Sequence, residues 1–245
     1  MSETKIALVT GANKGIGYEI AAGLGALGYR VGVGARDGAR RESAVDKLRS
    51  AGADAFGVPL DVTDDHSVTD AAALVERQAG HLDVLVNNAG VSGETGPGWV
   101  QDPTTLDLDV VRTVVETNVM GVIRVTNAML PLLRRSTSPR VVNVSSAVAS
   151  LTRQSDPDIE IGPVMAAYAP SKSFLNAVTV QYARQFAGTN ILINAACPGL
   201  VASDFTDFHG PRTPEQGAAT PIRLATLPDD GPTGSFFEDD GVIPW

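Results

Sequence analysis

The sequence has little cysteine, few aromatic residues, a deficit of positive charge and no long apolar run. Cys197 is the single cysteine among 245 residues. It excludes an intrachain disulfide and a multi-cysteine zinc site, and it fits a reducing compartment. Lys and Arg number 19 against 28 Asp and Glu, which gives a net charge of −9. This balance disfavours nucleic acid as a partner.

No apolar stretch approaches the roughly 20 residues that span a bilayer. The first apolar run, Ile6–Thr10, is too short for the core of a signal peptide. We therefore expect a soluble, cytoplasmic protein with no membrane partner, and we expect no metal site. Aromatic residues make up 5% of the chain whereas 25 residues are glycine, which permits close approach of backbones.

Short apolar segments rich in Val, Ile and Leu alternate with segments of helical period. Strands are expected at 5–10, 30–35, 55–62, 83–89, 140–145 and 191–196. Helices are expected at 16–27, around Val45 and Leu48, and at 65–79, 104–133, 166–187 and 214–227. Nearly continuous apolar strands are typical of a parallel sheet covered on both faces. The alternation predicts one α/β domain over residues 1–245, Rossmann-like and doubly wound, with a mostly parallel sheet between helices.

Two stretches interrupt this alternation. Residues 150–165 hold two prolines, a glycine and several acidic side chains, and they are expected to form a loop. Residues 203–245 are rich in proline and acidic residues and contain one expected helix. We expect both to lie on the substrate side.

A glycine-rich turn follows the first expected strand and opens the first expected helix. Gly11 permits a tight turn, and Gly15 and Gly17 remove side chains where a pyrophosphate and the packed helix approach closely. The free amides at the start of the helix then face the anion. A tight connection without a ligand is the alternative. The other residues of the turn with an expected role in binding are Asn13, Lys14 and Ile16.

Further motifs follow this turn in a fixed order. They are Asn87-Asn88-Ala89-Gly90, Asn118, Ser145-Ser146, the Tyr168-x-x-x-Lys172 pair and Pro198-Gly199. With the spacing T-G-x-x-x-G-x-G of the turn, they resemble the short-chain dehydrogenase/reductase family over essentially the whole chain. Within it the chain most resembles NADPH-dependent carbonyl reductases, by the turn itself, by Ala35-Arg36-Asp37 and by Gly234, Phe236 and Trp245.

Tyr168 and Lys172 are four residues apart in an expected helix, so their side chains share one face. An ammonium beside a phenol favours the phenolate and lowers the pKa of the tyrosine, which lets the pair move a proton. A tyrosine and a lysine on an ordinary amphipathic helix are the alternative. Ser146 lies at the carboxyl end of a strand, where an open α/β sheet binds its ligand. The family pattern favours Ser146 over Ser145 as the residue that holds the substrate carbonyl.

Asn118 is an amide in an apolar helical context, which is unfavourable for a short polar side chain. The resemblance implies that it supports a water-linked proton relay behind Lys172. A buried asparagine that hydrogen-bonds the backbone is the alternative.

Arg36 follows the second strand, near the position where a site for NAD carries a carboxylate. A guanidinium there can stack on adenine and bind a 2′-phosphate, and Lys14 can reach the same phosphate. Arg40 and Arg41 add positive charge to this region or are solvated surface residues. The cluster predicts NADPH, rather than NADH, as the cofactor.

The resemblance assigns Asp61 to the amino group of adenine, while acids next to it can cap the following helix. Ser203 stands where the family usually has threonine, and its hydroxyl can still bind the carboxamide of the nicotinamide. The remaining expected contacts to the dinucleotide are Val62, Asn88, Ala89, Pro198, Gly199 and Val201.

The gap between Ser146 and Tyr168 is longer than in compact relatives, so residues 150–165 are expected to form an enlarged, acidic wall of the substrate pocket. Residues 93–101 with Trp99 form another expected wall, although Trp99 could instead cap a surface patch. Residues 205–210 are an expected lid. An acidic rim favours neutral ketones and aldehydes over anionic substrates.

These residues lead to one hypothesis: hydride transfer from NADPH to a ketone or aldehyde, with Tyr168 as the proton donor. The alternatives are an alcohol dehydrogenase that works oxidatively and a dinucleotide-sensing regulator without turnover. The joint presence of Asn118, Ser146, Tyr168 and Lys172 argues against the regulator. The resemblance favours a homo-oligomer, a dimer or tetramer, whereas the enlarged loop favours a monomer.

Overall fold

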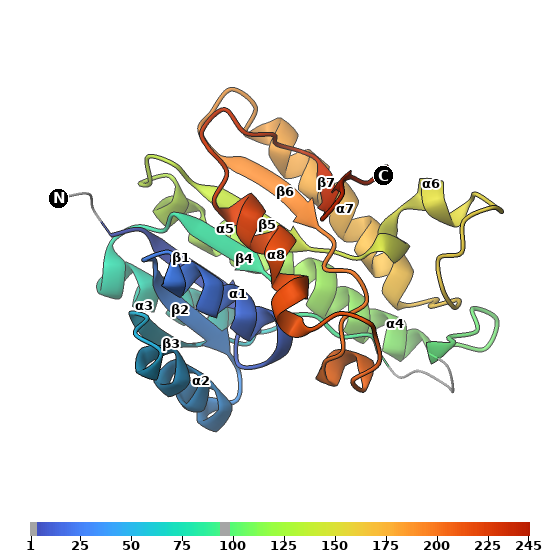
Figure 1. Ribbon diagram of the computed structural model, residues 1–245, viewed down its shortest axis with the longest axis horizontal. Helices are drawn as coiled ribbons and strands as arrows, with labels where there is room; N and C mark the ends of the chain where they lie inside the picture. The colour runs from blue at the N-terminus through green and yellow to red at the C-terminus, as the bar shows by residue number, and fades with distance from the viewer. Residues whose placement is uncertain (1–3, 94–98) are drawn as a thin grey trace.

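A sheet in the order β3-β2-β1-β4-β5-β6-β7-β8 forms the middle layer of the molecule (Figure 1). The computed structural model describes residues 4–93 and 99–245. The described strands are β1 (Ile6–Thr10), β2 (Arg30–Ala35), β3 (Ala55–Pro59), β4 (Val84–Asn87), β5 (Arg140–Val144), β6 (Leu192–Ala196), β7 (Phe236–Glu238) and β8 (Gly241–Val242). Neighbouring strands pair in parallel as far as β7, and β8 then pairs antiparallel to β7.

Helices cover both faces of this sheet. They are α1 (Gly15–Ala26), α2 (Gly38–Ser50), α3 (Asp65–Ala79), α4 (Leu108–Val115), α5 (Gly121–Leu133), α6 (Leu151–Gln154), α7 (Tyr168–Gln185) and α8 (Pro214–Ala225). Helices α1, α2 and α8 lie on one face, and α3, α5 and α7 lie on the other (Figure 1). Within the described ranges, no helix combines the length and the hydropathy needed to cross a membrane.

Each face of the sheet carries its own hydrophobic core. Consecutive residues of β1 show this, because Val9 packs with Ile20 of α1 whereas Leu8 packs with Val125 of α5. Successive side chains of a strand point to opposite faces, so a strand that is covered on both sides must be apolar throughout. The predicted doubly wound, mostly parallel α/β fold is confirmed.

The elements differ from the expected ones in several places. The strands expected at 55–62 and 83–89 end earlier, at Pro59 and Asn87. The long helical region expected at 104–133 begins at Leu108 and contains a π-helical turn, Glu116–Met120, between α4 and α5. The loop expected at 150–165 includes the four-residue helix α6, whose first turn is capped by Ser150. Strands β7 and β8 were not expected from the sequence.

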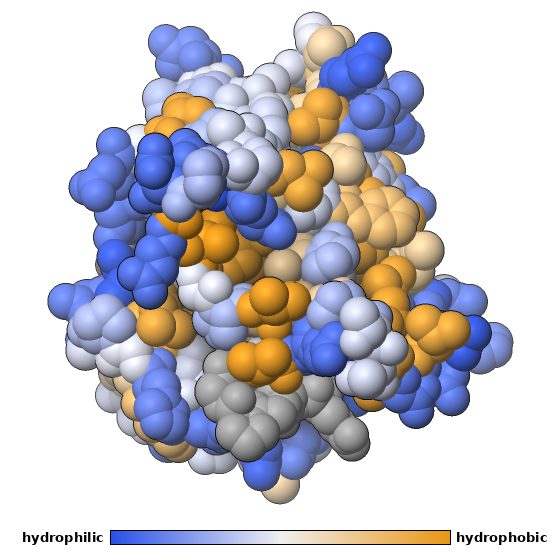
Figure 2. Space-filling view, turned by 90° about the vertical axis from the view of Figure 1, so that its right-hand side faces the viewer, coloured by the Kyte–Doolittle hydropathy of each residue, from blue (hydrophilic) through white to orange (hydrophobic). Residues whose placement is uncertain are grey.

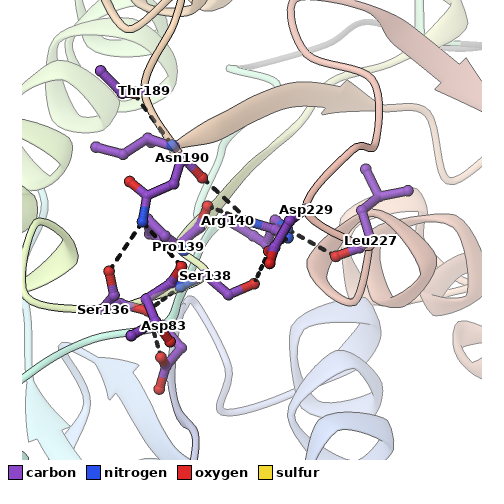
Figure 3. Close-up of polar contacts among 11 residues, drawn as sticks. Asp83, Ser136, Ser138, Pro139, Arg140, Thr189, Asn190, Leu227 and Asp229 are labelled. Carbon is purple, nitrogen blue, oxygen red and sulfur yellow. Dashed lines mark hydrogen bonds and ion pairs between the residues drawn. The ribbon is translucent and has the colours of Figure 1, made fainter.

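A buried polar cluster holds the edge of the sheet at which the parallel strands begin (Figure 3). Arg140, the first residue of β5, is 2% exposed. It donates hydrogen bonds to the carbonyls of Pro139, Leu227 and Asn190 and forms an ion pair with Asp229 at 2.7 Å. Beside it, the carboxylate of Asp83 accepts hydrogen bonds from the Ile6 amide and the Ser136 hydroxyl. These contacts tie the amino ends of β1, β4 and β5 together, at the edge opposite the carboxyl ends.

Candidate active site

A cleft of about 1280 Å³ lies at the carboxyl ends of the parallel strands. Figure 2 views the side of the molecule toward which these strands point, and apolar residues gather in the middle of this face. In open α/β sheets, this edge is where ligands bind. No cluster of His, Cys, Asp or Glu that could hold a metal ion occurs within residues 4–93 and 99–245.

The turn between β1 and α1 forms one end of the cleft. Gly11 and Gly15 adopt positive φ angles of 65° and 55°, which favour glycine. A Cβ at Gly17 would lie well within 3.0 Å of the Gly11 carbonyl oxygen and of Asn88 Nδ2. Lys14 occupies the N-cap of α1 and makes no side-chain cap hydrogen bond, so the first amides of α1 remain available to an anion. Asn13, Ile16 and Asn88, which were predicted to bind the dinucleotide, also line the cleft.

Positive side chains lie near the turn, each beside an acid. The ammonium of Lys14 is 3.1 Å from Asp204, and the guanidinium of Arg36 is 3.9 Å from Asp61. Both bases line the cleft together with Arg40. Arg41 does not belong to this cluster, because its guanidinium is 12% exposed and donates to the carbonyl of Ala35. Its contribution of positive charge to the phosphate region stays a prediction, although its side chain does not line the cleft.

The carboxylate of Asp61 is held by local hydrogen bonds. It accepts from the amide and the hydroxyl of Thr63, at 3.0 and 2.7 Å. Burial acts to raise the pKa of Asp61, but these hydrogen bonds and the charges of Arg36 and Arg124 together hold it below its ordinary value. Val62 lines the cleft beside it. The nearby Asp64 caps α3 by accepting from the Ser67 amide, which realises the capping role considered for the neighbouring acids.

The segment after β6 forms the opposite end of the cleft. The four residues of this segment that were predicted to bind the dinucleotide all line it: Pro198, Gly199, Val201 and Ser203. Ser203 is buried, and its amide donates to the hydroxyl of Thr206 at 3.0 Å. Ala89, by contrast, does not line the cleft, and its amide donates to the hydroxyl of Thr10 behind the glycine turn.

Tyr168 and Lys172 lie one turn apart at the start of α7 and are both buried. The ammonium of Lys172 donates to the carbonyl of Val144 at 2.8 Å and lies 5.7 Å from the centre of the Tyr168 ring. Burial lowers the pKa of Lys172 to about 8. Burial also raises the pKa of Tyr168, while a hydrogen bond with the Ser146 side chain opposes that rise. The expected lowering of the Tyr168 pKa is wrong for the protein alone, because loss of solvent outweighs the hydrogen bond with Ser146.

The two serines after β5 differ in their contacts. Ser145 is buried and its hydroxyl donates to the side chain of Asn176 at 2.7 Å, so it is engaged in the packing of α7. Both serines line the cleft, but Ser146 is partly exposed and is hydrogen-bonded to Tyr168. The geometry therefore favours Ser146 as the serine that a substrate can reach.

Asn118 lies in the π-helical turn and is completely buried. Its side chain accepts from the Val91 amide and donates to the Val91 carbonyl, both at 2.9 Å, and it also donates to Ser171. It does not line the cleft. The side chain thus makes the backbone hydrogen bonds of the alternative, and both Asn118 and Lys172 border Gly90. The proton relay behind Lys172 stays a prediction.

The substrate side of the cleft is apolar and aromatic. The ring of Phe205 lies 5.5 Å from that of Tyr168 and 6.0 Å from that of Trp99, measured between centres. Residues 161–163 and Met165 of the enlarged loop line the cleft. The acidic residues of that loop, at 156, 158 and 160, are exposed and are not among the lining residues, so the expected acidic wall is wrong. Residues 94–98 of the other expected wall lie outside the described residues.

Gln101 is a contact of the site that the sequence did not reveal. It is 3% exposed, and its side-chain oxygen accepts from the amides of Ala167 and Tyr168. The one sequence signal was indirect. The helix that carries Tyr168 follows two alanines, at 166 and 167, and neither can cap it.

Known proteins are similar to this chain in both sequence and fold. A family model described as short chain dehydrogenase matches residues 5–213. The whole chain is 34% identical to carbonyl reductase [NADPH] 1 of Sus scrofa, over 95% of that relative. It is 33% identical to short-chain dehydrogenase/reductase 1 of Saponaria officinalis, with 100% of this chain and 97% of the relative covered.

Two solved structures have the same fold. Salutaridine reductase from Papaver somniferum superposes with a TM-score of 0.83 at 30% identity, over 96% of this chain and 99% of that chain. Actinorhodin polyketide ketoreductase with NADPH superposes with a TM-score of 0.82 at 30% identity, over 96% and 95% of the two chains. The match of the family model over most of the chain, with the similarity of these relatives, identifies the protein as an enzyme of the short-chain dehydrogenase/reductase family, whose oxidoreductases bind a nicotinamide dinucleotide.

Proposed function

We propose that the protein is an NADPH-dependent carbonyl reductase that acts on neutral ketones or aldehydes. The observation that carries this proposal is the group Ser146, Tyr168 and Lys172 at the carboxyl edge of the sheet, in the same cleft as the glycine turn. Tyr168 and Lys172 are buried, and Ser146 is partly exposed. A proton donor and a binding region for a nucleotide thereby share one cavity. The name of the Sus scrofa relative, carbonyl reductase [NADPH] 1, agrees with this proposal.

The residues of the cleft fit a dinucleotide. The space that a Cβ at Gly17 would fill, together with the uncapped start of α1, suits the pyrophosphate. We assign Asp61 to the adenine, and Asn88 with the backbone near Ala89 to the adenosine ribose. The nicotinamide end is assigned to Lys172, Pro198, Gly199, Val201 and Ser203.

The preference for NADPH rests on Lys14 and Arg36, which line the cleft at the end where the adenosine would lie. Asp37, the first acid after β2, accepts from the Arg40 amide at 2.9 Å and caps α2. Its carboxylate also lines the cleft but is engaged by the helix, and the guanidinium of Arg36 directly after β2 is the group that we assign to the adenosine ribose end. This arrangement favours a 2′-phosphate over a 2′-hydroxyl.

When bound, the dinucleotide supplies the hydride, and the protein supplies position and charge. The hydroxyls of Ser146 and Tyr168 are placed to hold the oxygen of the substrate carbonyl. Burial raises the pKa of Tyr168, so the phenol is protonated at neutral pH. The proton that it gives to that oxygen therefore needs a neighbour that stabilises the phenolate. Lys172 is an ammonium below about pH 8 and stabilises the phenolate that the transfer leaves. Asn118 fixes the segment after β4 behind this group rather than touching the substrate.

The test follows the consumption of NADPH by its absorbance with a panel of ketones, aldehydes and quinones, and repeats it with NADH. Turnover with NADPH should exceed that with NADH. Tyr168→Phe should reduce kcat by about 10²–10⁴-fold, the usual contribution of a general acid. Tyr182→Phe is the matched control, because Tyr182 lies on the same helix, donates to Asn127 and does not line the cleft.

Three results would contradict the proposal. Near-normal turnover by Tyr168→Phe would show that Tyr168 is not the proton donor. Equal use of NADH and NADPH would contradict the assignment of NADPH as the cofactor. Tight binding of NADPH without turnover on any carbonyl would instead favour a dinucleotide-sensing regulator.

A further inference from the structure

The helix that carries Tyr168 has no capping side chain of its own. Its N-cap is Ala167, with φ −96° and ψ −46°, and no side chain adjacent in sequence accepts from its first amides. The start of a helix leaves backbone N–H groups without partners inside the helix, and alanine is a poor N-cap residue. Ala167 and Tyr168 are both buried, so water cannot easily serve these amides.

Gln101 provides the missing acceptor from a distant part of the chain. Its Oε1 accepts from the Ala167 amide at 3.0 Å and from the Tyr168 amide at 3.4 Å, 66 and 67 residues along the chain. The side chain is 3% exposed. A single amide oxygen thus caps the helix at the residue that bears the phenol.

The other end of Gln101 is fixed to two further segments. Its Nε2 donates to the Ser92 carbonyl at 2.9 Å, and its own backbone amide donates to the Val164 carbonyl at 2.8 Å. Asn118 holds Val91, the residue before Ser92, through two hydrogen bonds. Two buried amide side chains therefore clamp successive residues of the segment after β4, and Gln101 connects that segment to the start of α7.

Lys172 is held independently of this contact. It lies one turn further into α7, and its ammonium is anchored on Val144 at the end of β5. Tyr168 is the first residue of the helix, where ends fray and where a cap matters most. The loss of Gln101 should therefore displace the phenol more than the ammonium.

We propose that Gln101 is a positioning residue for Tyr168, and that it sets where the phenol hydroxyl lies beside Ser146. This inference rests on the proposed function, in which Tyr168 is the proton donor. Gln101 acts through the backbone of α7 and does not touch the substrate. Misplacement of a reacting group by about 1 Å can cost on the order of 10²-fold in rate, so a cap at this residue is felt in kcat.

The experiment compares three variants of Gln101 in the full chain. Gln101→Leu removes both hydrogen-bonding groups, and Gln101→Asn withdraws them by one methylene. Gln101→Glu keeps an oxygen acceptor for the Ala167 and Tyr168 amides, where a carboxylate suits the start of a helix, but it replaces the donor to Ser92 with a second carboxyl oxygen. We expect kcat to fall by about 10–100-fold in the Leu and Asn variants and to recover most of its value in the Glu variant.

Two readouts separate positioning from general loss of structure. The dissociation constant of NADPH and the decline of activity near pH 8 should stay as in the unmodified enzyme, since Lys172 keeps its anchor on Val144. Thr213→Ala is the control, because it removes the cap of α8, at the Gln216 amide, without touching α7. It should lower the melting temperature and leave kcat unchanged.

The outcomes are distinct. Unchanged kcat in Gln101→Leu or Gln101→Asn overturns the inference. It is also overturned if all three variants lose kcat and NADPH affinity equally and their decline of activity moves away from pH 8. If Gln101→Leu does not fold, the comparison of the Asn and Glu variants decides by the same criteria. Tyr168→Phe is measured alongside: if it is fully active, the proposed function fails and this inference with it. If it is inactive while Gln101→Asn is normal, only this inference fails.

Discussion

Replacement of Gly17 by alanine tests whether the turn after β1 is shaped by close approach of backbone atoms. The methyl group of Gly17→Ala would fall well within 3.0 Å of the Gly11 carbonyl oxygen and of Asn88 Nδ2. The first of these is backbone, and the second is fixed because the Asn88 amide donates to the carbonyl of Thr10. Neither can withdraw as a flexible side chain would, so the turn itself must open.

The size of the effect follows from two opposing terms. Forcing a methyl group into a packed site costs about 1–3 kcal/mol. Alanine in place of glycine in a helix stabilises the folded protein by up to about 1 kcal/mol. A net loss of about 1–2 kcal/mol lowers the melting temperature of a chain of this size by roughly 2–8 °C. Because the turn that moves is the one assigned to the pyrophosphate, the affinity for NADPH should fall by at least about 10-fold, or 1.4 kcal/mol.

The assay is a thermal melt together with a titration of NADPH by its fluorescence. Gly38→Ala is the matched control. Gly38 is the first residue of α2, and a Cβ there would lie 3.7 Å from the Arg41 side chain, which is ordinary van der Waals contact. That variant should melt at the same or a slightly higher temperature and bind NADPH normally. Normal melting and normal binding by Gly17→Ala would refute the steric reasoning. Equal losses in both variants would show that glycine content, not contact, governs the effect.

Three further expectations concern other parts of the molecule. The kcat/KM for carbonyl reduction should fall as pH rises through about 8, because the lowered pKa of Lys172 means that the free enzyme loses this ammonium there. A flat profile to pH 10 would contradict the role of Lys172 as the cation beside Tyr168. Arg140→Met should lower the free energy of unfolding by about 1.5–3 kcal/mol in urea denaturation without changing kcat, because hydrogen bonds to a charged group are lost far from the cleft. Asp229→Asn should matter much less, since that carboxylate is 72% exposed, and equal losses would undermine this account. Asp204→Asn should free Lys14 from its ion pair and lower the KM for NADPH but not for NADH, whereas an equal change in both would argue against a 2′-phosphate at Lys14.

Most of the sheet was predictable because strands that are buried on both faces need continuous apolar segments, which can be recognised in the sequence. Strand β2 matches its expected bounds for this reason. Strands β7 and β8 contain only three and two residues, too few to show a period, and β7 owes its place to pairing with the distant β6. The π-helical turn within 104–133 was equally invisible, since it differs from an α-helix in backbone register rather than in composition.

The site divides in the same way between local and distant contacts. The glycine turn and the Tyr168–Lys172 pair are defined by short spacings, so the sequence predicted where both would lie. Gln101 could not be found from spacing, because its partners are 66 and 67 residues away. Neighbouring residues gave no means to tell Arg36, which lines the cleft, from Arg41, which folds back onto Ala35. The direction of the Tyr168 pKa depends on burial, which only the assembled fold determines.

The placement of the two tryptophans gives the protein an optical probe of its own. Trp99 lines the cleft near Phe205, whereas Trp245 stacks on Phe236 with its carbonyl bonded to Thr152. Since the chain has only these two indoles, a Trp245→Phe variant would leave all tryptophan emission to the wall of the cleft. The emission maximum and the quenching of Trp99 would then change when a bound ligand excludes water from that wall or covers it. No added fluorescent label would be needed.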